Sequence, residues 1–137
     1  MPSNKEIVAA AFEKMAEGDP SLYLDMMADD IRYELVGDNS WGRIYTGKQA
    51  FREELGRPLM SRVEPPLKMR VTRILADGDH VILESAGENR TRSGEPYNNR
   101  YCMIMHMAGG KIVELTEYTD TDLVLRRLGD RVQPPEA

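Results

Sequence analysis

The sequence predicts an α+β fold in which helices come first and an antiparallel sheet follows. Apolar residues over 7–15 recur every three or four positions, which is the period of an amphipathic helix. After Pro65-Pro66, apolar residues alternate with polar ones instead, which is the period of a half-buried strand. Tight turns at Asp77-Gly78-Asp79 and Gly109-Gly110 separate these strands. Helices followed by hairpin-linked strands are typical of the α+β class.

The N-terminal half is expected to hold three helices. Ser3 and Glu6 resemble a capping box that opens the first helix, and Gly18 ends it. Asp19-Pro20 resembles an N-cap and first-turn proline for a second helix. The segments expected after the first helix are a short helix through Met27, a strand over 31–35, an extended piece at 44–45 and a third helix over 47–55.

The C-terminal half is expected to form four strands, over 67–76, 80–88, 96–107 and 112–118, and a closing helical turn over 123–128. In the last strand, Val113, Leu115 and Glu117 share one face. Because Val113 and Leu115 are apolar, we expect this face to point inward and to carry Glu117 with it. A long, curved sheet wrapped around the helices would leave a pocket at its open end.

Length and composition limit the class of protein. The 137 residues suit a single domain over 1–130, with a tail over 131–137 that we expect to be disordered. The chain has 18 Lys and Arg against 23 Asp and Glu, a net charge of −5, which does not favour a nucleic-acid partner. Its one cysteine, Cys102, cannot form an internal disulfide. Without a signal-like start or an apolar run of about 20 residues, we expect a cytoplasmic protein that does not enter membranes.

Three segments resemble a known family. The start of the first strand at 28–33, the Tyr45-Thr46-Gly47 turn and the ending over 110–120 resemble the NTF2-like superfamily, and within it the SnoaL-like, ketosteroid-isomerase-related proteins. The resemblance implies a cone, with N-terminal helices packed into a curved, mostly antiparallel (mixed) sheet around an open-ended pocket. It also implies a homodimer formed through the outer face of the sheet. The superfamily includes isomerases, cyclases, epoxide hydrolases and non-catalytic modules, so the fold does not fix the reaction.

The functional residues of particular relatives are matched unevenly. A steroid isomerase would need its base Asp at Leu35, a Tyr at 11–12 and a second acid at 101–102, and this chain has none of these. The limonene-epoxide-hydrolase pattern is matched at Tyr33 and Glu117. Where that pattern has Asn, Arg and Asp, this chain instead has Leu35, Ser85 and Gly87. Phenazine-biosynthesis proteins carry a pocket glutamate shortly before a final Leu-rich helix, and Glu117 occupies that place here.

Glu117 is the predicted acid/base residue and Tyr33 its predicted catalytic partner. A carboxylate against apolar walls has a raised pKa, which suits general acid/base chemistry near neutral pH. We expect a small hydrophobic metabolite as the ligand and neither a metal nor a cofactor, because His80 and His106 are predicted to face away from the pocket. The residues expected to contact the substrate are Trp41, Ser85, Asn99, Tyr101 and Met103.

Three functions stay open on the sequence. The first is an isomerase, cyclase or dehydratase that uses Glu117, and the second is a non-catalytic module that binds a ligand or dimerises. The second would suit a Glu117 that is paired with Arg126 or Arg127, or that caps the last helix. The third is an epoxide hydrolase, which requires a second carboxylate near Glu117. Asp120 is the expected N-cap of the last helix.

Overall fold

A computed structural model describes residues 1–132 of the chain. Of the predicted disordered tail over 131–137, residues 133–137 lie outside the described part. Within residues 1–132, no helix is long and apolar enough to cross a membrane.

The first helix begins at the predicted cap, whereas the second begins one residue later than predicted, with Pro20 instead of Asp19 at the N-cap and Ser21 as its first residue. Helix α1 (Asn4–Ala16) opens with the capping box, in which the Ser3 hydroxyl accepts a hydrogen bond of 3.1 Å from the Glu6 amide. Gly18 follows α1 with a φ of 88°, a left-handed conformation that glycine adopts without strain. Before α2 (Ser21–Met26), the Asp19 carboxylate accepts a hydrogen bond of 3.0 Å from the Ser21 amide.

The third helix runs further than its predicted end at residue 55. It consists of α3 (Lys48–Ala50), a wider π-helical segment η1 (Phe51–Gly56) and α4 (Arg57–Met60). Pro58 has no amide hydrogen to donate to the carbonyl of Glu54, four residues earlier. The Arg131 guanidinium donates to that carbonyl instead, at 3.2 Å. Pro58 lies in the first turn of α4, where the missing amide hydrogen is tolerated, and the third helix therefore continues past it.

Six strands form one mixed sheet. Strands β1 and β8 pair in parallel, and the other neighbours pair antiparallel. In the order β2-β1-β8-β7-β4-β3, the sheet contains β2 (Arg43–Thr46), β1 (Met27–Leu35), β8 (Lys111–Thr119), β7 (Arg100–Ala108), β4 (His80–Gly87) and β3 (Met69–Asp77).

The predicted strand over 96–107 is interrupted after two residues. A short hairpin of β5 (Asn89–Arg90) and β6 (Pro96–Tyr97) precedes β7. The side chains of Asn98 and Asn99 take over main-chain hydrogen bonds at the break, from the amides of Asn89 and Arg100 at 3.1 and 2.7 Å. The polar asparagines thus separate β6 from β7.

The prediction that Val113 of β8 points inward is wrong. The pairing of β7 with β8 shifts between His106 and Met107, which leaves Val113 as the extra residue of a bulge. Ile112 is fully buried in its place, and Val113 is only half-buried. Beyond the bulge the alternation resumes, so Leu115 and Glu117 are buried as predicted.

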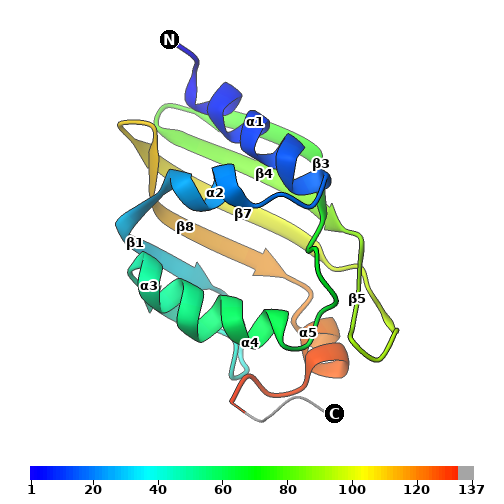
Figure 1. The fold of residues 1–137 in the computed structure, drawn as a ribbon. Helices are drawn as coiled ribbons and strands as arrows, with labels where there is room; N and C mark the ends of the chain where they lie inside the picture. Colours follow the sequence, from blue (N-terminus) through cyan, green and yellow to red (C-terminus); the bar gives the residue numbers. More distant parts are fainter. Residues whose placement is uncertain (133–137) are drawn as a thin grey trace.

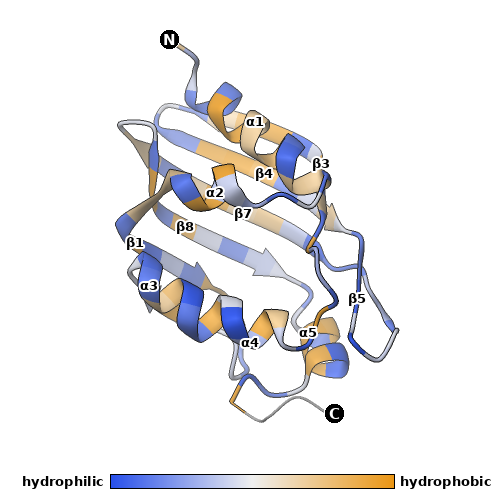
Figure 2. Cartoon of the chain, in the orientation of Figure 1, coloured by the Kyte–Doolittle hydropathy of each residue, from blue (hydrophilic) through white to orange (hydrophobic). Residues whose placement is uncertain are grey.

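The helices and the sheet enclose the core. In Figure 1, α1 runs along β3 and β4 at one edge of the sheet, and α3 to α4 lie in front of the other edge, beside β1. Figure 2 shows hydrophobic and hydrophilic residues alternating along these helices, as expected of helices with one buried side. Helix α5 (Thr121–Leu128) follows β8 and lies at one end of the sheet (Figure 1). This arrangement is the α+β cone that the sequence predicts.

Candidate functional site

A cavity of about 90 Å³ lies inside the cone, and we refer to it as the inner cavity. Five of the seven predicted site residues line it, and they come from β1, β7, β8 and the loop before β2. The complete lining is Met15, Tyr23, Tyr33, Leu35, Trp41, Phe51, Leu55, Gly56, Leu59, Leu67, Met69, Tyr97, Tyr101, Met103, Glu117, Thr119, Val124 and Leu128.

Glu117 is the one charged side chain in this described lining. Its position in β8 lies between Leu35 of β1 and Met103 of β7, and both of these neighbours are buried and apolar. The Glu117 side chain is 8% exposed. The sheet therefore presents a single carboxylate to an otherwise apolar and aromatic space.

Tyr33 holds this carboxylate. It lies on β1, two residues before Leu35, so it shares the inward face, and its hydroxyl donates a short hydrogen bond to Glu117 Oε1. The Tyr33 ring packs against Phe51, with ring centroids 4.6 Å apart. Burial and the nearby Glu117 charge raise the pKa of Tyr33 well above 10, so the hydroxyl remains a donor near neutral pH.

Burial raises the pKa of Glu117 to about 7, and the hydrogen bond from Tyr33 offsets part of this rise. The alternative ion pairs expected for Glu117 are not formed. Arg126 pairs with Asp122 at 2.7 Å, and Arg127 pairs with Glu95 at 3.2 Å. Glu117 thus lacks a compensating cation in the described part of the chain.

Asp120, rather than Glu117, caps α5. The Asp120 carboxylate accepts a hydrogen bond of 3.1 Å from the Leu123 amide, which confirms its predicted role as N-cap. The helix then places Val124 and Leu128 against the inner cavity. Glu117 is consequently free of a structural role in α5.

Trp41 forms part of the cavity wall and also fastens the C-terminal end of α5. Its indole Nε1 donates to the carbonyl of Gly129 at 2.7 Å. The Arg62 guanidinium lies over the indole ring, 5.2 Å from its centroid, and donates to the carbonyls of Leu128 and Asp130 at 2.8 Å each. These contacts hold the segment that closes this end of the inner cavity.

Two predicted substrate contacts do not line the inner cavity. Asn99 is buried, but its amide hydrogen-bonds to the main chain of Asp120 and Arg100. Ser85 is buried on the inner face of β4, and its hydroxyl has no hydrogen-bond partner among the described residues. Tyr101 and Met103 lie on the inward face of β7, and both line the cavity.

Tyr23 is a cavity residue that the sequence does not single out. It lies on α2, and its ring packs edge-on against Phe12 with a centroid distance of 5.1 Å. Its hydroxyl is buried beside the hydroxyl of Tyr33, without a hydrogen bond of good geometry in the described structure. Burial, and then the nearby Glu117 charge, raise the pKa of Tyr23. The one signal in the sequence is a tyrosine within a short, mostly apolar helix.

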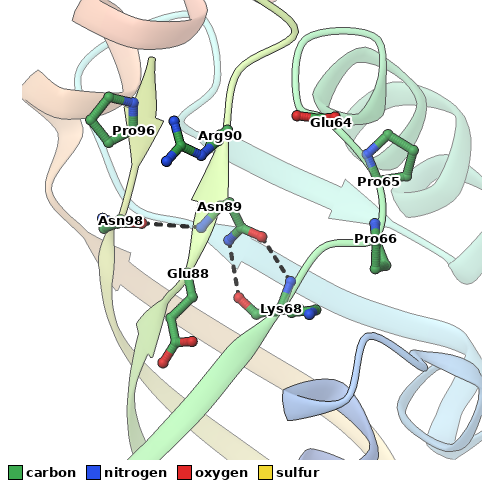
Figure 3. A pocket seen from close by; sticks show the side chains of 9 residues that line it. All are labelled: Glu64, Pro65, Pro66, Lys68, Glu88, Asn89, Arg90, Pro96 and Asn98. Carbon is green, nitrogen blue, oxygen red and sulfur yellow. Dashed lines mark hydrogen bonds between the residues drawn. The ribbon is translucent and has the colours of Figure 1, made fainter. Parts of the chain in front are cut away.

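A larger groove of about 350 Å³ lies on the surface beside the β5–β6 hairpin (Figure 3). The Asn89 side chain at its centre bonds the main chain of Lys68 through both its oxygen and its nitrogen, at 2.8 and 3.0 Å. Its acids, Glu64 and Glu88, are exposed. Because it contains neither a buried acid nor a polar group that lacks a partner, the groove is a weaker candidate than the inner cavity.

The described residues do not form a metal site, and the inner cavity has no second carboxylate in its described lining. Among residues 1–132, no three His, Cys, Asp or Glu side chains gather closely enough to hold a metal ion. His80 and His106 stack on each other outside the inner cavity, with ring centroids 4.8 Å apart. The lining given above includes neither an arginine nor a second carboxylate, which the epoxide-hydrolase hypothesis requires.

Comparison with known proteins places these features in a family. A model of the SnoaL-like domain matches residues 8–115. No curated protein matches the chain. Among solved structures, an NTF2-like protein of unknown function from Burkholderia pseudomallei is 14% identical, and an NTF2-like protein from Burkholderia thailandensis is 21% identical. Each has a TM-score of 0.78 and covers 93% of this chain and 98% of its own.

An epoxide hydrolase is also similar in fold. This limonene-epoxide-hydrolase-like enzyme from Mycobacterium tuberculosis is 22% identical, with a TM-score of 0.68, and the match covers 91% of this chain and 88% of that one. Identities at this level establish the shared cone and not a shared reaction.

Proposed function

Because the chain belongs to the SnoaL-like domain family, we propose that it is a cofactor-independent enzyme that moves protons on a small hydrophobic substrate. The reaction is an isomerisation, cyclisation or dehydration of a cyclic or carbonyl-bearing compound. One observation carries the proposal: Glu117, hydrogen-bonded by Tyr33, is buried in an apolar cavity, where its pKa is raised to about 7. A group with this pKa both accepts and returns a proton near neutral pH.

The proton transfer uses Glu117 in both directions. The ionised carboxylate takes a proton from the carbon next to a carbonyl, and the electrons of the C–H bond move toward the carbonyl oxygen to form an enolate. The protonated Glu117 then returns the proton to the same carbon or to another one. Tyr33 fixes the orientation of the carboxylate, and Tyr101 on β7 offers a hydroxyl that orients the substrate.

The size of the inner cavity limits the part of the substrate that it encloses. Its volume of about 90 Å³ is smaller than the roughly 150 Å³ of an apolar cavity that holds benzene. The cavity is partly open to solvent, so the rest of a larger substrate can extend out of it. The group that enters beside Glu117 is therefore compact.

Deuterium exchange tests the proposal without knowledge of the natural product. Cyclopentanone, cyclohexanone and 2-cyclohexenone are incubated with the protein in D₂O, and loss of the proton signal next to the carbonyl is followed by NMR. We expect exchange above the buffer rate, and a loss of about 100-fold or more in Glu117→Gln. Glu84→Gln is the matched control, because Glu84 is on the outer face of the sheet and pairs with Arg73 at 2.7 Å. Exchange by Glu117→Gln at the wild-type rate would contradict the mechanism.

A non-catalytic ligand-binding module is the alternative. The observation that favours it is the presence of a single acid in the described cavity lining, with no second group to share the proton transfer. This alternative predicts that the ketones bind, as detected by NMR shift changes, but that no deuterium is incorporated at the carbon next to the carbonyl.

We also propose that the chain forms a homodimer through the outer face of the sheet. Leu75 and Ile104 are 50% and 36% exposed there, and Ile82 of β4 pairs with both of them in register. Tyr118 on β8 is 46% exposed. An exposed apolar row across adjacent strands is a surface that a second copy can cover.

A further inference from the structure

The inner cavity surrounds its one carboxylate with aromatic rings. Six aromatic side chains, from helices, strands and loops on different sides of the cavity, contribute to the lining: Tyr23, Tyr33, Trp41, Phe51, Tyr97 and Tyr101. We propose that the inner cavity is a binding site for a small alkylammonium ion, with Glu117 as its counter-ion. This inference concerns the charge of the bound ligand and does not depend on the proposed proton-transfer reaction.

The charge balance of the cavity supports a cationic ligand. The described lining contains neither Lys nor Arg, and the two nearest candidates in sequence, Arg126 and Arg127, pair with other acids. Ionised Glu117 therefore has an uncompensated negative charge in a medium of low dielectric constant, where charge interactions are strong. A cationic ligand compensates that charge, whereas a carboxylate or phosphate ligand would add to it.

The cavity walls favour an alkylated cation over a metal ion. The faces of aromatic rings carry negative potential and attract cations such as quaternary ammonium groups. Three thioethers, from Met15, Met69 and Met103, add polarisable apolar surface. A metal ion needs several oxygen or nitrogen ligands in place of its water shell, and these walls offer one carboxylate. The alkyl groups of an ammonium ion instead contact the apolar walls directly.

The cavity leaves room for a compact group only. Its volume of about 90 Å³ favours a small ammonium group over a long, branched amine, and tetramethylammonium is the smallest quaternary ammonium ion that can probe it. Glu117 belongs to the lining of this space, although the residue as a whole is only 8% exposed. Carboxylate and cation can therefore come into direct contact.

Binding of such a cation is expected to depend on pH through Glu117. The tyrosines that face Glu117 have raised pKa values because they are buried, and Tyr97 reaches about 12, so these groups stay neutral between pH 6 and 8. Helices α1 and α5 and the segment η1 contribute only apolar residues to the lining. The tyrosines concerned are Tyr23 of α2, Tyr33 of β1, Tyr97 of β6 and Tyr101 of β7. Tyr45 of β2 lies outside the lining, and its hydroxyl donates to the Trp41 carbonyl.

A permanently charged probe and a neutral analogue of similar size test the inference. Tetramethylammonium chloride and tert-butanol are titrated separately into the protein at pH 6 and pH 8, and binding is measured by calorimetry and NMR. With a Glu117 pKa of about 7, the affinity for tetramethylammonium should be about tenfold lower at pH 6 than at pH 8, because protons compete for the carboxylate. The affinity for tert-butanol should be weaker at pH 8 and should not change with pH.

Two variants complete the experiment. Glu117→Gln should lose tetramethylammonium binding, whereas Glu84→Gln, which neutralises an exposed carboxylate on the outer face, should retain it. The inference is overturned if tetramethylammonium does not bind, if its affinity is the same at both pH values, or if tert-butanol binds equally well. The wild-type pH dependence and the neutral probe keep the test decisive even if Glu117→Gln folds poorly.

The outcome is separable from that of the deuterium-exchange assay. Ketone exchange without tetramethylammonium binding would overturn the cation site and leave the proposed reaction standing. Cation binding without exchange would support the cation site and count against the proton-transfer enzyme.

Discussion

Glu117 is buried beside a single hydrogen-bond donor, Tyr33, and this environment makes protein stability depend on pH. Its pKa is about 7 in the folded protein against 4.5 when exposed, so the folded state keeps this proton over a range in which the unfolded chain has released it. The stabilisation of the folded state that this proton provides is fully present below pH 4.5 and is lost as the pH rises to about 7. The expected loss is about 3 kcal/mol of unfolding free energy.

Urea unfolding at pH 4.5 and pH 8 measures this dependence. Other groups titrate in the same range, so the relevant quantity is the difference between the wild type and Glu117→Gln at each pH. From pH 4.5 to pH 8, we expect the unfolding free energy of Glu117→Gln to increase by about 3 kcal/mol relative to that of the wild type. Glu84→Gln, which changes an exposed carboxylate, should show no comparable gain. An unchanged difference for Glu117→Gln would mean that the pKa of Glu117 is ordinary.

Tyr23 is expected to limit stability. Its hydroxyl is buried beside that of Tyr33 but forms no hydrogen bond of good geometry in the described part of the chain, which costs free energy in the folded state. Tyr23→Phe should therefore leave the unfolding free energy unchanged or raise it by about 1 kcal/mol. Tyr45→Phe is the matched control, because it removes a hydrogen bond of 2.7 Å to the Trp41 carbonyl and should cost about 1 kcal/mol. A clear loss of stability in Tyr23→Phe, measured in urea, would show that its hydroxyl is satisfied.

At the scale of residues, strand alternation predicted which side chains point inward but not which of them reach the cavity. Tyr33, Tyr101 and Glu117 lie at positions that alternation predicts to point inward, and they line the cavity. Ser85 and Asn99 were also predicted to point inward, but they lie outside the cavity, because the helices and the β5–β6 hairpin cover other parts of the inner face. Alternation identifies a face, whereas the packed helices determine which part of that face stays open.

At the scale of elements, features with local causes were predictable and features that depend on distant partners were not. The caps at Ser3 and Asp120 need only a side chain and an amide three residues away, and both form. The bulge at Val113 arises where the pairing with β7 shifts register, which alternation along one strand cannot reveal. The Arg131 guanidinium, from far along the chain, donates to the Glu54 carbonyl within the third helix. That contact cannot be read from the sequence of the helix.

Removing the α5 cap should weaken the helix that closes one end of the cavity. Asp120→Ala eliminates the side-chain acceptor of the Leu123 amide and should lower the unfolding free energy by about 1 kcal/mol. Asp120→Asn retains an acceptor oxygen and should cost less. Asp122→Ala, on the same helix, removes only an exposed ion pair with Arg126 and serves as the control. If Asp120→Ala and Asp122→Ala cost the same in urea unfolding, the cap does not stabilise α5.

At the scale of the whole molecule, the proposed dimer can be tested by a mutation on the outer face of the sheet. Ile104→Lys introduces a charge into the exposed apolar row and should convert the dimer into a monomer, as measured by light scattering during size-exclusion chromatography. Leu22→Lys is the matched control, because Leu22 is 43% exposed on α2, away from the sheet face. A monomeric wild type, or an Ile104→Lys variant that remains dimeric, would count against this interface.

The sequence by itself determined the α+β class, the first and last helix caps, the antiparallel hairpins and the inward direction of Glu117. All of these follow from the period of apolar residues or from contacts over a few positions. Only the tertiary structure decided that Arg126 and Arg127 pair away from Glu117, that Tyr23 joins the site, and that the cavity is small. Burial and charge compensation depend on residues far apart in the chain, and these two quantities give Glu117 its raised pKa.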